Sequence, residues 1–235
     1  MATLVLFDID GTLVLTGGAG VRAMARALRD VFGITAGLGD VPVAGRTDAW
    51  ILAQVADAHG VARDDERIGR FQDCYFSYLE REVMEPGPRK GVLPGVRPLL
   101  DVLSSRGDVH LGLLTGNYYH GARIKLQHFD LWRYFATGAF GDDAHDRNGL
   151  LWTAIERVAA AGGPSVDPAD VVVIGDTPLD VAVAVAGGAR SLAVATGSYS
   201  ADVLLDSGAD VVLETLSDLG KVLDVLRLPA SGSGM

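Results

Sequence analysis

Two aspartates, Asp8 and Asp10, directly follow the apolar residues 4–7. An unbroken apolar run is typical of a strand buried on both faces of a parallel sheet. Two carboxylates this close together repel each other, and a bound cation is the usual way to stabilise such a pair. Gly11 and Thr12 then turn the chain. The alternative is that Asp8 only ends a strand and Asp10 only opens a turn; we favour the metal-binding interpretation.

Two further apolar segments end in polar groups. Residues 110–114 are followed by Thr115-Gly116-Asn117, and residues 171–174 by Gly175-Asp176, with Asp180 four residues further on. Each motif alone could be a turn or a helix cap. However, ligands of open α/β sheets bind at the carboxyl ends of strands, where the strand order reverses. The three strand ends therefore predict one shared site.

The elements that must position these residues alternate along the second half of the chain. Strand-like apolar segments are each preceded or followed by a segment with helical periodicity, which predicts an α/β domain with an open, mainly parallel sheet. The three motifs can converge only if strand 4–7 lies centrally, with the other two as its neighbours. Predicted helices cover residues 96–105, 121–128, 150–161, 179–186 and 216–226, and predicted strands cover 109–114, 135–139, 171–174 and 191–195, while the apolar segments 203–205 and 211–213 precede the last helix.

Residues 17–85 show helical periodicity and no strand signal. A helix over residues 21–31 ends at Gly33, a second begins at Thr47 or Asp48 and runs to about residue 59, and a third runs from Asp64 to about residue 83. Glycine-rich segments on either side are predicted to form a hinge. We therefore expect a Rossmann-like core of residues 1–16 and 88–228, an inserted helical cap of residues 17–87, and a flexible tail of residues 229–235.

Composition limits the class of partner. The chain has 235 residues, 49% of them hydrophobic, and a net charge of −10. This charge disfavours binding to nucleic acid or to an anionic membrane surface. There is no apolar run long enough to span a bilayer and no signal-like leader, so we expect a cytoplasmic protein. The single cysteine, Cys74, is interpreted as a buried structural thiol. A monomer and a homodimer both remain open.

The three motifs together resemble the haloacid-dehalogenase-like (HAD) hydrolase superfamily, over residues 3 to about 226. The residues that carry this resemblance are Asp8-Ile9-Asp10-Gly11-Thr12, Thr115-Gly116-Asn117 and Gly175-Asp176-Thr177-Pro178-Leu179-Asp180. The inserted helices resemble a cap of the first type, as in phosphatases similar to phosphoglycolate phosphatase and in β-phosphoglucomutase-like enzymes.

The resemblance implies hydrolysis of a phosphomonoester through an aspartyl-phosphate. Asp8 would be the nucleophile and Asp10 the general acid and base. Mg²⁺ would be held by Asp8, the Asp10 backbone carbonyl, Asp176 and Asp180. The phosphoryl group would be bound by Thr115, which also has a catalytic role, and by Gly11, Thr12, Gly116 and Asn117.

The sequence departs from the family pattern at the cationic residue, which is usually a lysine followed by proline. No Lys-Pro pair occurs here. We favour Arg147, which lies at a suitable distance before Asp176, over Lys125, because a helix would carry Lys125 away from the strand ends. The alternatives are a solvated Lys125 and an Arg147 that only pairs with neighbouring aspartates. Arg46, at the start of a cap helix, is the candidate for an anionic group of the substrate, or else an ordinary surface charge.

Other functions are weighed on the same residues. Asp10 disfavours a dehalogenase, which lacks the second acid in this family. A sugar-phosphate phosphomutase shares both aspartates and the cap, and so remains the main alternative. A phospho-accepting signalling module is usually much shorter and lacks the insertion, and the intact acids argue against a non-catalytic binder. The substrate is expected to be a small phosphorylated metabolite, with phosphoglycolate suggested only by the family.

Overall fold

The computed structural model describes residues 3–62, 65–144 and 147–228, and its main element is a six-stranded parallel sheet in the order β5-β4-β1-β6-β7-β8. β1 lies between β4 and β6, and the side chains of residues 4–7 are fully buried. The predicted fold class and the central position of the first strand are confirmed. The strands are β1 Thr3–Phe7, β4 Val109–Leu114, β5 Thr137–Ala139, β6 Val171–Gly175, β7 Arg190–Val194 and β8 Val211–Leu213.

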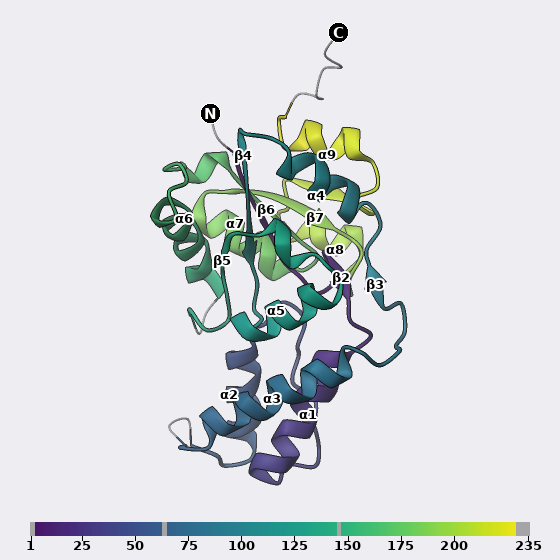
Figure 1. Cartoon of the computed structure of the whole chain (residues 1–235), viewed down its shortest axis with the longest axis vertical. Helices are drawn as coiled ribbons and strands as arrows, with labels where there is room; N and C mark the ends of the chain where they lie inside the picture. Colours follow the sequence, from purple (N-terminus) through teal and green to yellow (C-terminus); the bar gives the residue numbers. More distant parts are fainter. Residues whose placement is uncertain (1–2, 63–64, 145–146, 229–235) are drawn as a thin grey trace.

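Alternate residues of β1 pack into different layers, as the period of two of a strand requires. Val5 and Phe7 belong to a cluster with α4 (Val96–Ser104), α5 (Tyr119–His128) and α9 (Leu219–Val225). Leu4 and Leu6 belong to a cluster with α6 (Leu150–Ala160) and α7 (Pro178–Gly187). Helices therefore cover both faces of the sheet (Figure 1).

The remaining long helices pack together below the sheet in Figure 1. They are α1 (Ala19–Phe32), α2 (Asp48–Ala58) and α3 (Ile68–Glu82), and they share one hydrophobic cluster. Gly33 ends α1 with a φ of 75°, as predicted. Of the two predicted caps of α2, Thr47 is the one that caps the helix: its hydroxyl accepts a hydrogen bond from the Trp50 N–H. Asp64, the predicted start of the third helix, lies outside the described residues. Cys74 is half-buried rather than fully buried.

Two short elements were not predicted. β2 (Val14–Leu15) and β3 (Gly91–Val92) form an antiparallel pair that joins the two connections to the helical segment. The same connections touch at Gly17 and Gly87, where a Cβ atom on Gly17 would lie 2.7 Å from the Gly87 Cα. Of the two apolar segments near the C-terminus, residues 203–205 lie in α8 (Ala201–Asp206), whereas residues 211–213 form β8. No helix in the described ranges is long and apolar enough to cross a membrane.

Candidate active site

Three buried aspartates meet at the carboxyl ends of β1 and β6. Because these strands are adjacent and parallel, Asp8 and Asp176 leave the sheet side by side. Asp180 joins them from the first turn of α7, and carboxylate oxygens of all three lie within 4.8 Å of one another. Asp180 is fixed by Thr177, whose backbone N–H and hydroxyl donate to it at 3.0 and 2.7 Å. The sequence motif thus serves as a capping box and as part of the acidic cluster.

Glycines surround this cluster because no side chain would fit beside the carboxylates. A Cβ atom on Gly11, which has a φ of +87°, would lie 2.3 Å from an oxygen of Asp176. A Cβ atom on Gly197 would lie 1.7 Å from the same oxygen. The Thr12 hydroxyl donates to the other oxygen of Asp176 at 3.2 Å. The backbone therefore closes tightly around the carboxylates.

Crowding of acids in a buried site makes their ionisation unfavourable. Burial raises the pKa of Asp8 to about 6, and although Arg147 opposes this shift, Asp180 and Asp10 add to it. Burial and the neighbouring Asp8 also raise the pKa of Asp176 well above its usual value. A hard divalent cation that prefers carboxylate oxygens would relieve this repulsion, so the donor set fits such an ion. The fit rests on Asp8, Asp176 and Asp180.

Arg147 lies among these acids. One of its terminal nitrogens, Nη2, lies 3.1 Å from Asp8 Oδ1 and also contacts Asp180. The other, Nη1, donates to the Gly45 carbonyl at 2.8 Å. Its Nε is buried and has no hydrogen-bond partner among the described residues. The arginine favoured from the sequence is therefore brought to the acidic cluster and retains one unused donor.

Lys125 also reaches the site, and the sequence argument that its helix would carry it away is wrong. Its Nζ lies 2.5 Å from Asp10 Oδ2 and 2.5 Å from the side-chain oxygen of Asn117. Helix α5 begins near the end of β4 and runs across the site, so a long side chain from its second turn can return to the strand ends. Burial alone would lower the pKa of Lys125, but the carboxylates of Asp10 and Asp48 outweigh it and raise the pKa.

The loop after β4 links these groups to one another. The side-chain amide of Asn117 donates to Asp10 Oδ2 and to the Thr115 hydroxyl oxygen, both at 2.9 Å. Thr115 is fully buried, and its hydrogen bond to Asp8 lowers the pKa of that carboxyl against the effect of burial. Gly116 has no room for a side chain, because a Cβ atom there would lie 2.2 Å from the Arg46 carbonyl oxygen. The predicted hydroxyl and amide residues are therefore next to both aspartates.

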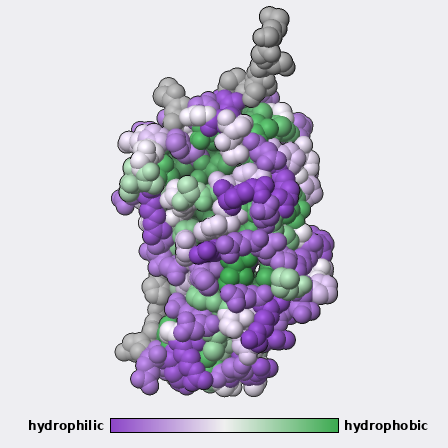
Figure 2. Space-filling view, in the orientation of Figure 1, coloured by the Kyte–Doolittle hydropathy of each residue, from purple (hydrophilic) through white to green (hydrophobic). Residues whose placement is uncertain are grey.

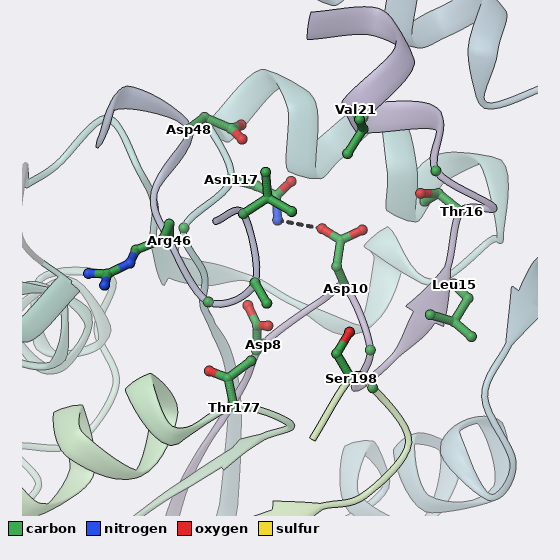
Figure 3. A pocket seen from close by; sticks show the side chains of 18 of the residues that line it. Asp8, Asp10, Leu15, Thr16, Val21, Arg46, Asp48, Asn117, Thr177 and Ser198 are labelled. Atoms are coloured by element: carbon green, nitrogen blue, oxygen red, sulfur yellow. Dashed lines mark hydrogen bonds between the residues drawn. The ribbon is translucent and has the colours of Figure 1, made fainter. Parts of the chain in front are cut away.

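Arg46 is placed differently from the other predicted site residues. Its guanidinium stacks over the Trp50 ring, 4.4 Å from the ring centre, and the side chain is exposed. Figure 3 shows it directed away from Asp8 and Asp10. The backbone of this segment, by contrast, docks onto the core: the Asp48 N–H donates to the Gly116 carbonyl at 2.8 Å.

Several site residues were missed by sequence reasoning. Asp48 accepts hydrogen bonds from the Tyr118 N–H at 2.9 Å and from the Tyr75 hydroxyl at 3.4 Å. Its burial raises its pKa to about 6, opposed by Lys125. The sequence identified Asp48 only as a possible helix start, which gave no reason to expect its carboxylate beside the core. Gly45 and Gly197 were missed because their role lies in close approaches between distant segments.

A cavity of 410 Å³ lies between the sheet and helices α1–α3, with Asp8, Asp10, Lys125 and Arg147 on its core side. This volume falls within the usual range for small-molecule sites, about 300–1,000 Å³. The arrangement combines buried carboxylates, two buried cations and a cavity that can hold a small ligand.

Comparisons with known proteins agree with this geometry. The family model of the haloacid dehalogenase-like hydrolases matches residues 2–188. The probable phosphatase IndB of Dickeya dadantii is 30% identical over 243 residues, which cover 98% of each chain. A phosphoglycolate phosphatase of Rhodospirillum rubrum is 28% identical over 99% of this chain and 94% of the relative. The crystal structure of a hydrolase from Pseudomonas syringae has the same fold, with a TM-score of 0.69, 24% identity and coverage of 96% and 99%. The chain therefore belongs to the haloacid dehalogenase-like hydrolases.

Proposed function

We propose that this enzyme is a Mg²⁺-dependent phosphatase that hydrolyses a small phosphorylated metabolite through an aspartyl-phosphate intermediate. The observation that carries the proposal is the pairing of two differently placed aspartates at one strand end. Asp8 is buried in the acidic cluster, while Asp10 has a side chain that is 41% exposed and faces Lys125. One carboxylate is thus held for attack, and the other is accessible for proton transfer.

In the first half-reaction, an Asp8 carboxylate oxygen attacks the phosphorus atom. A new P–O bond forms to Asp8, and the P–O bond to the leaving alcohol breaks. Asp10 donates a proton to the leaving oxygen, so that a neutral alcohol departs. In the second half-reaction, Asp10 takes a proton from a water molecule as that water attacks phosphorus. The bond between phosphorus and the Asp8 oxygen breaks, which releases phosphate and restores the Asp8 carboxylate and the protonated Asp10.

Other residues of the chain would bind the phosphoryl group and balance its charge. Thr115 and the backbone around Gly116 and Asn117 lie beside Asp8 and offer donors. Arg147 supplies a charge next to Asp8 together with its unused Nε–H, and Lys125 supplies one next to Asp10. Mg²⁺, held by Asp8, Asp176 and Asp180 with the Asp10 carbonyl, would offset the negative charge of the phosphoryl oxygens.

We also propose that residues 17–87 act as a cap that opens to admit substrate and closes to exclude water. The paired connections, with Gly17 against Gly87, support a hinge at this position, because both connections could bend together. The docking of Asp48 on the loop after β4 supports the closed position.

The proposal is tested with the full chain, p-nitrophenyl phosphate and a set of phosphorylated metabolites. Phosphate release should require Mg²⁺ and should be abolished in Asp8→Asn, which retains the shape but not the nucleophile. Trapping of phosphate on wild-type Asp8 by peptide mass measurement would identify the intermediate directly. Undiminished turnover by Asp8→Asn would overturn the mechanism.

The alternative is a phosphomutase, because Asp8 and Asp10 could equally return the phosphoryl group to a second hydroxyl. The relatives named as phosphatases match over nearly their whole length, which supports hydrolysis. Incubation with a bisphosphorylated sugar separates the two activities. A phosphatase releases inorganic phosphate, whereas a mutase yields an isomeric sugar phosphate.

A further inference from the structure

The side of the active-site cavity that faces the phosphoryl site differs sharply from the side formed by the cap. The side that faces the phosphoryl site is lined by charged residues: Asp8, Asp10, Lys125 and Arg147. The cap side is formed by residues of α1–α3 and their connecting loops. Most of these residues are apolar: Val21, Met24, Leu38, Val43 and Ile51. Leu15 continues this surface from β2, and Figure 3 shows Leu15 and Val21 on the Asp10 side of the cavity.

Met24 and Ile51 belong to the packed interior of the cap, but other parts of this apolar surface are exposed. Val21 is 44% exposed and Val43 is 37% exposed, and both count among the few large apolar side chains that the described residues leave exposed. Apolar side chains are also visible at the surface where the helical part meets the sheet (Figure 2). An apolar surface that opens into an active-site cavity is typical of a binding site for an apolar part of a ligand.

Charged groups on the cap side do not favour a second anion. Arg46 lies at the edge of the cavity, but its guanidinium stacks on Trp50 and is directed away from Asp8 and Asp10, as Figure 3 shows. Arg89 also lines the cavity, on the connection from the cap, but it is solvent exposed, where water and salt screen its charge. The buried charge that the cap does present is the carboxylate of Asp48. A carboxylate or second phosphate on the substrate would be repelled by Asp48 and would lose its hydration against apolar walls.

We infer that the substrate is a phosphomonoester of an uncharged, mainly apolar alcohol, whose organic part is bound by the surface formed by Leu15, Val21, Met24, Leu38, Val43 and Ile51. This inference rests on the proposed phosphatase function and names its substrate class. It separates this enzyme from a phosphatase of phosphoglycolate and from a mutase of bisphosphorylated sugars, since both need the cap to accept an anion.

A matched pair of substrates tests the inference. Isobutyl phosphate and phosphoglycolate have organic parts of nearly the same shape, but one ends in two methyl groups and the other in a carboxylate. With Mg²⁺ and the full chain, kcat/KM should be at least about tenfold higher for isobutyl phosphate. Along the series methyl, ethyl, propyl and butyl phosphate, kcat/KM should rise about threefold to fourfold per methylene, which corresponds to ~0.8 kcal/mol. A higher kcat/KM for phosphoglycolate, or a flat alkyl series, would overturn the inference.

A variant of Val21 tests whether the cap surface causes the preference for isobutyl phosphate over phosphoglycolate. Val21→Lys places a cation at an exposed position of α1, so it should lower kcat/KM for isobutyl phosphate and raise it for phosphoglycolate. Val185→Lys is the matched control, because Val185 is 61% exposed on α7 and outside the cavity. This control should leave the ratio of the two substrates unchanged. If phosphoglycolate is the better substrate of the wild type and Arg89→Ala removes that activity, the inference is overturned and the cap binds an anion instead.

Binding without turnover separates this inference from the proposed function. Calorimetry should give a lower Kd for butylphosphonate than for phosphonoacetate, neither of which contains a hydrolysable ester. Failure to hydrolyse any ester, p-nitrophenyl phosphate included, would overturn the phosphatase proposal, whereas the phosphonate preference would still be measured. Tighter binding of phosphonoacetate would overturn the substrate class, even if the enzyme proved to be a phosphatase.

Discussion

Lys125 Nζ lies 2.5 Å from Asp10 Oδ2, although 115 residues separate them in the chain. The lysine is almost fully buried, whereas the aspartate is partly exposed to the cavity. A second ion pair joins Arg147 to Asp8. The two aspartates of one short motif therefore each have their own cation, and we expect the two cations to support different parts of the reaction.

Replacement of the lysine should affect proton transfer most. Lys125→Met keeps the unbranched side chain to within one atom of its length but removes the charge that faces Asp10. We expect kcat/KM for p-nitrophenyl phosphate to fall by about 10²-fold or more, the usual contribution of a positioned acid or base. Lys221→Met, at an exposed position of α9, is the matched control. A kcat/KM of Lys125→Met equal to that of wild type would contradict this role.

The acidic cluster should destabilise the metal-free protein near neutral pH. The pKa of Asp8 is raised in the folded state, so folding favours the protonated form. The stability that this form contributes is complete below the unfolded pKa near 4 and is lost as pH rises through about 6. In chelator at pH 7.5, Asp8→Asn should therefore have a higher Tm than wild type, and the difference should shrink towards pH 4.5. Thermal unfolding across this range measures it, and a lower Tm for Asp8→Asn at pH 7.5 would contradict the electrostatic argument.

Addition of Mg²⁺ should reverse this destabilisation. An ion that binds only the folded state stabilises it by about 2.7 kcal/mol at a concentration of 100 Kd. We expect a higher Tm for wild type with Mg²⁺ and little or no increase for Asp176→Asn, which loses one charge of the cluster. Asp224→Asn, at an exposed position of α9, should respond as wild type does. An equal Tm increase in Asp176→Asn would place the ion elsewhere.

The sequence was sufficient to predict those features of the fold and the site that depend on local sequence pattern and on sheet geometry. Asp8, Thr115 and Asp176 each follow an apolar strand, and parallel strands bring their carboxyl ends to one edge, so these residues were predicted to meet. Gly33 was identified as a helix end, and the next helix start was narrowed to Thr47 or Asp48, because capping is a local property.

Features that depend on how helices, strands and connections are oriented relative to one another could not be predicted from the sequence. The distance of Lys125 from Thr115 along the chain said nothing about the path of α5 across the site. β2 and β3 are two residues each, and they pair only because the chain leaves and re-enters the core at one place. The contact of Asp48 with the Tyr118 N–H likewise requires the relative position of cap and core.

The contact between Gly116 and the segment before α2 should be needed for catalysis, because it joins the proposed cap to the loop after β4, which we propose binds the phosphoryl group. A Cβ atom on Gly116 would lie 2.2 Å from the Arg46 carbonyl oxygen and 2.9 Å from the Thr47 Cα. Both are backbone atoms, so in Gly116→Ala the cap segment must move away and the hydrogen bond between the Asp48 N–H and the Gly116 carbonyl must lengthen from 2.8 Å. A displacement of this size near reacting groups can cost about 10²-fold in rate. We expect kcat/KM to fall by this factor in a phosphate-release assay. The control is Gly107→Ala, because a Cβ atom there would meet nothing within 4 Å. Near-wild-type activity of Gly116→Ala would show that phosphoryl transfer does not require the cap to be docked on this loop.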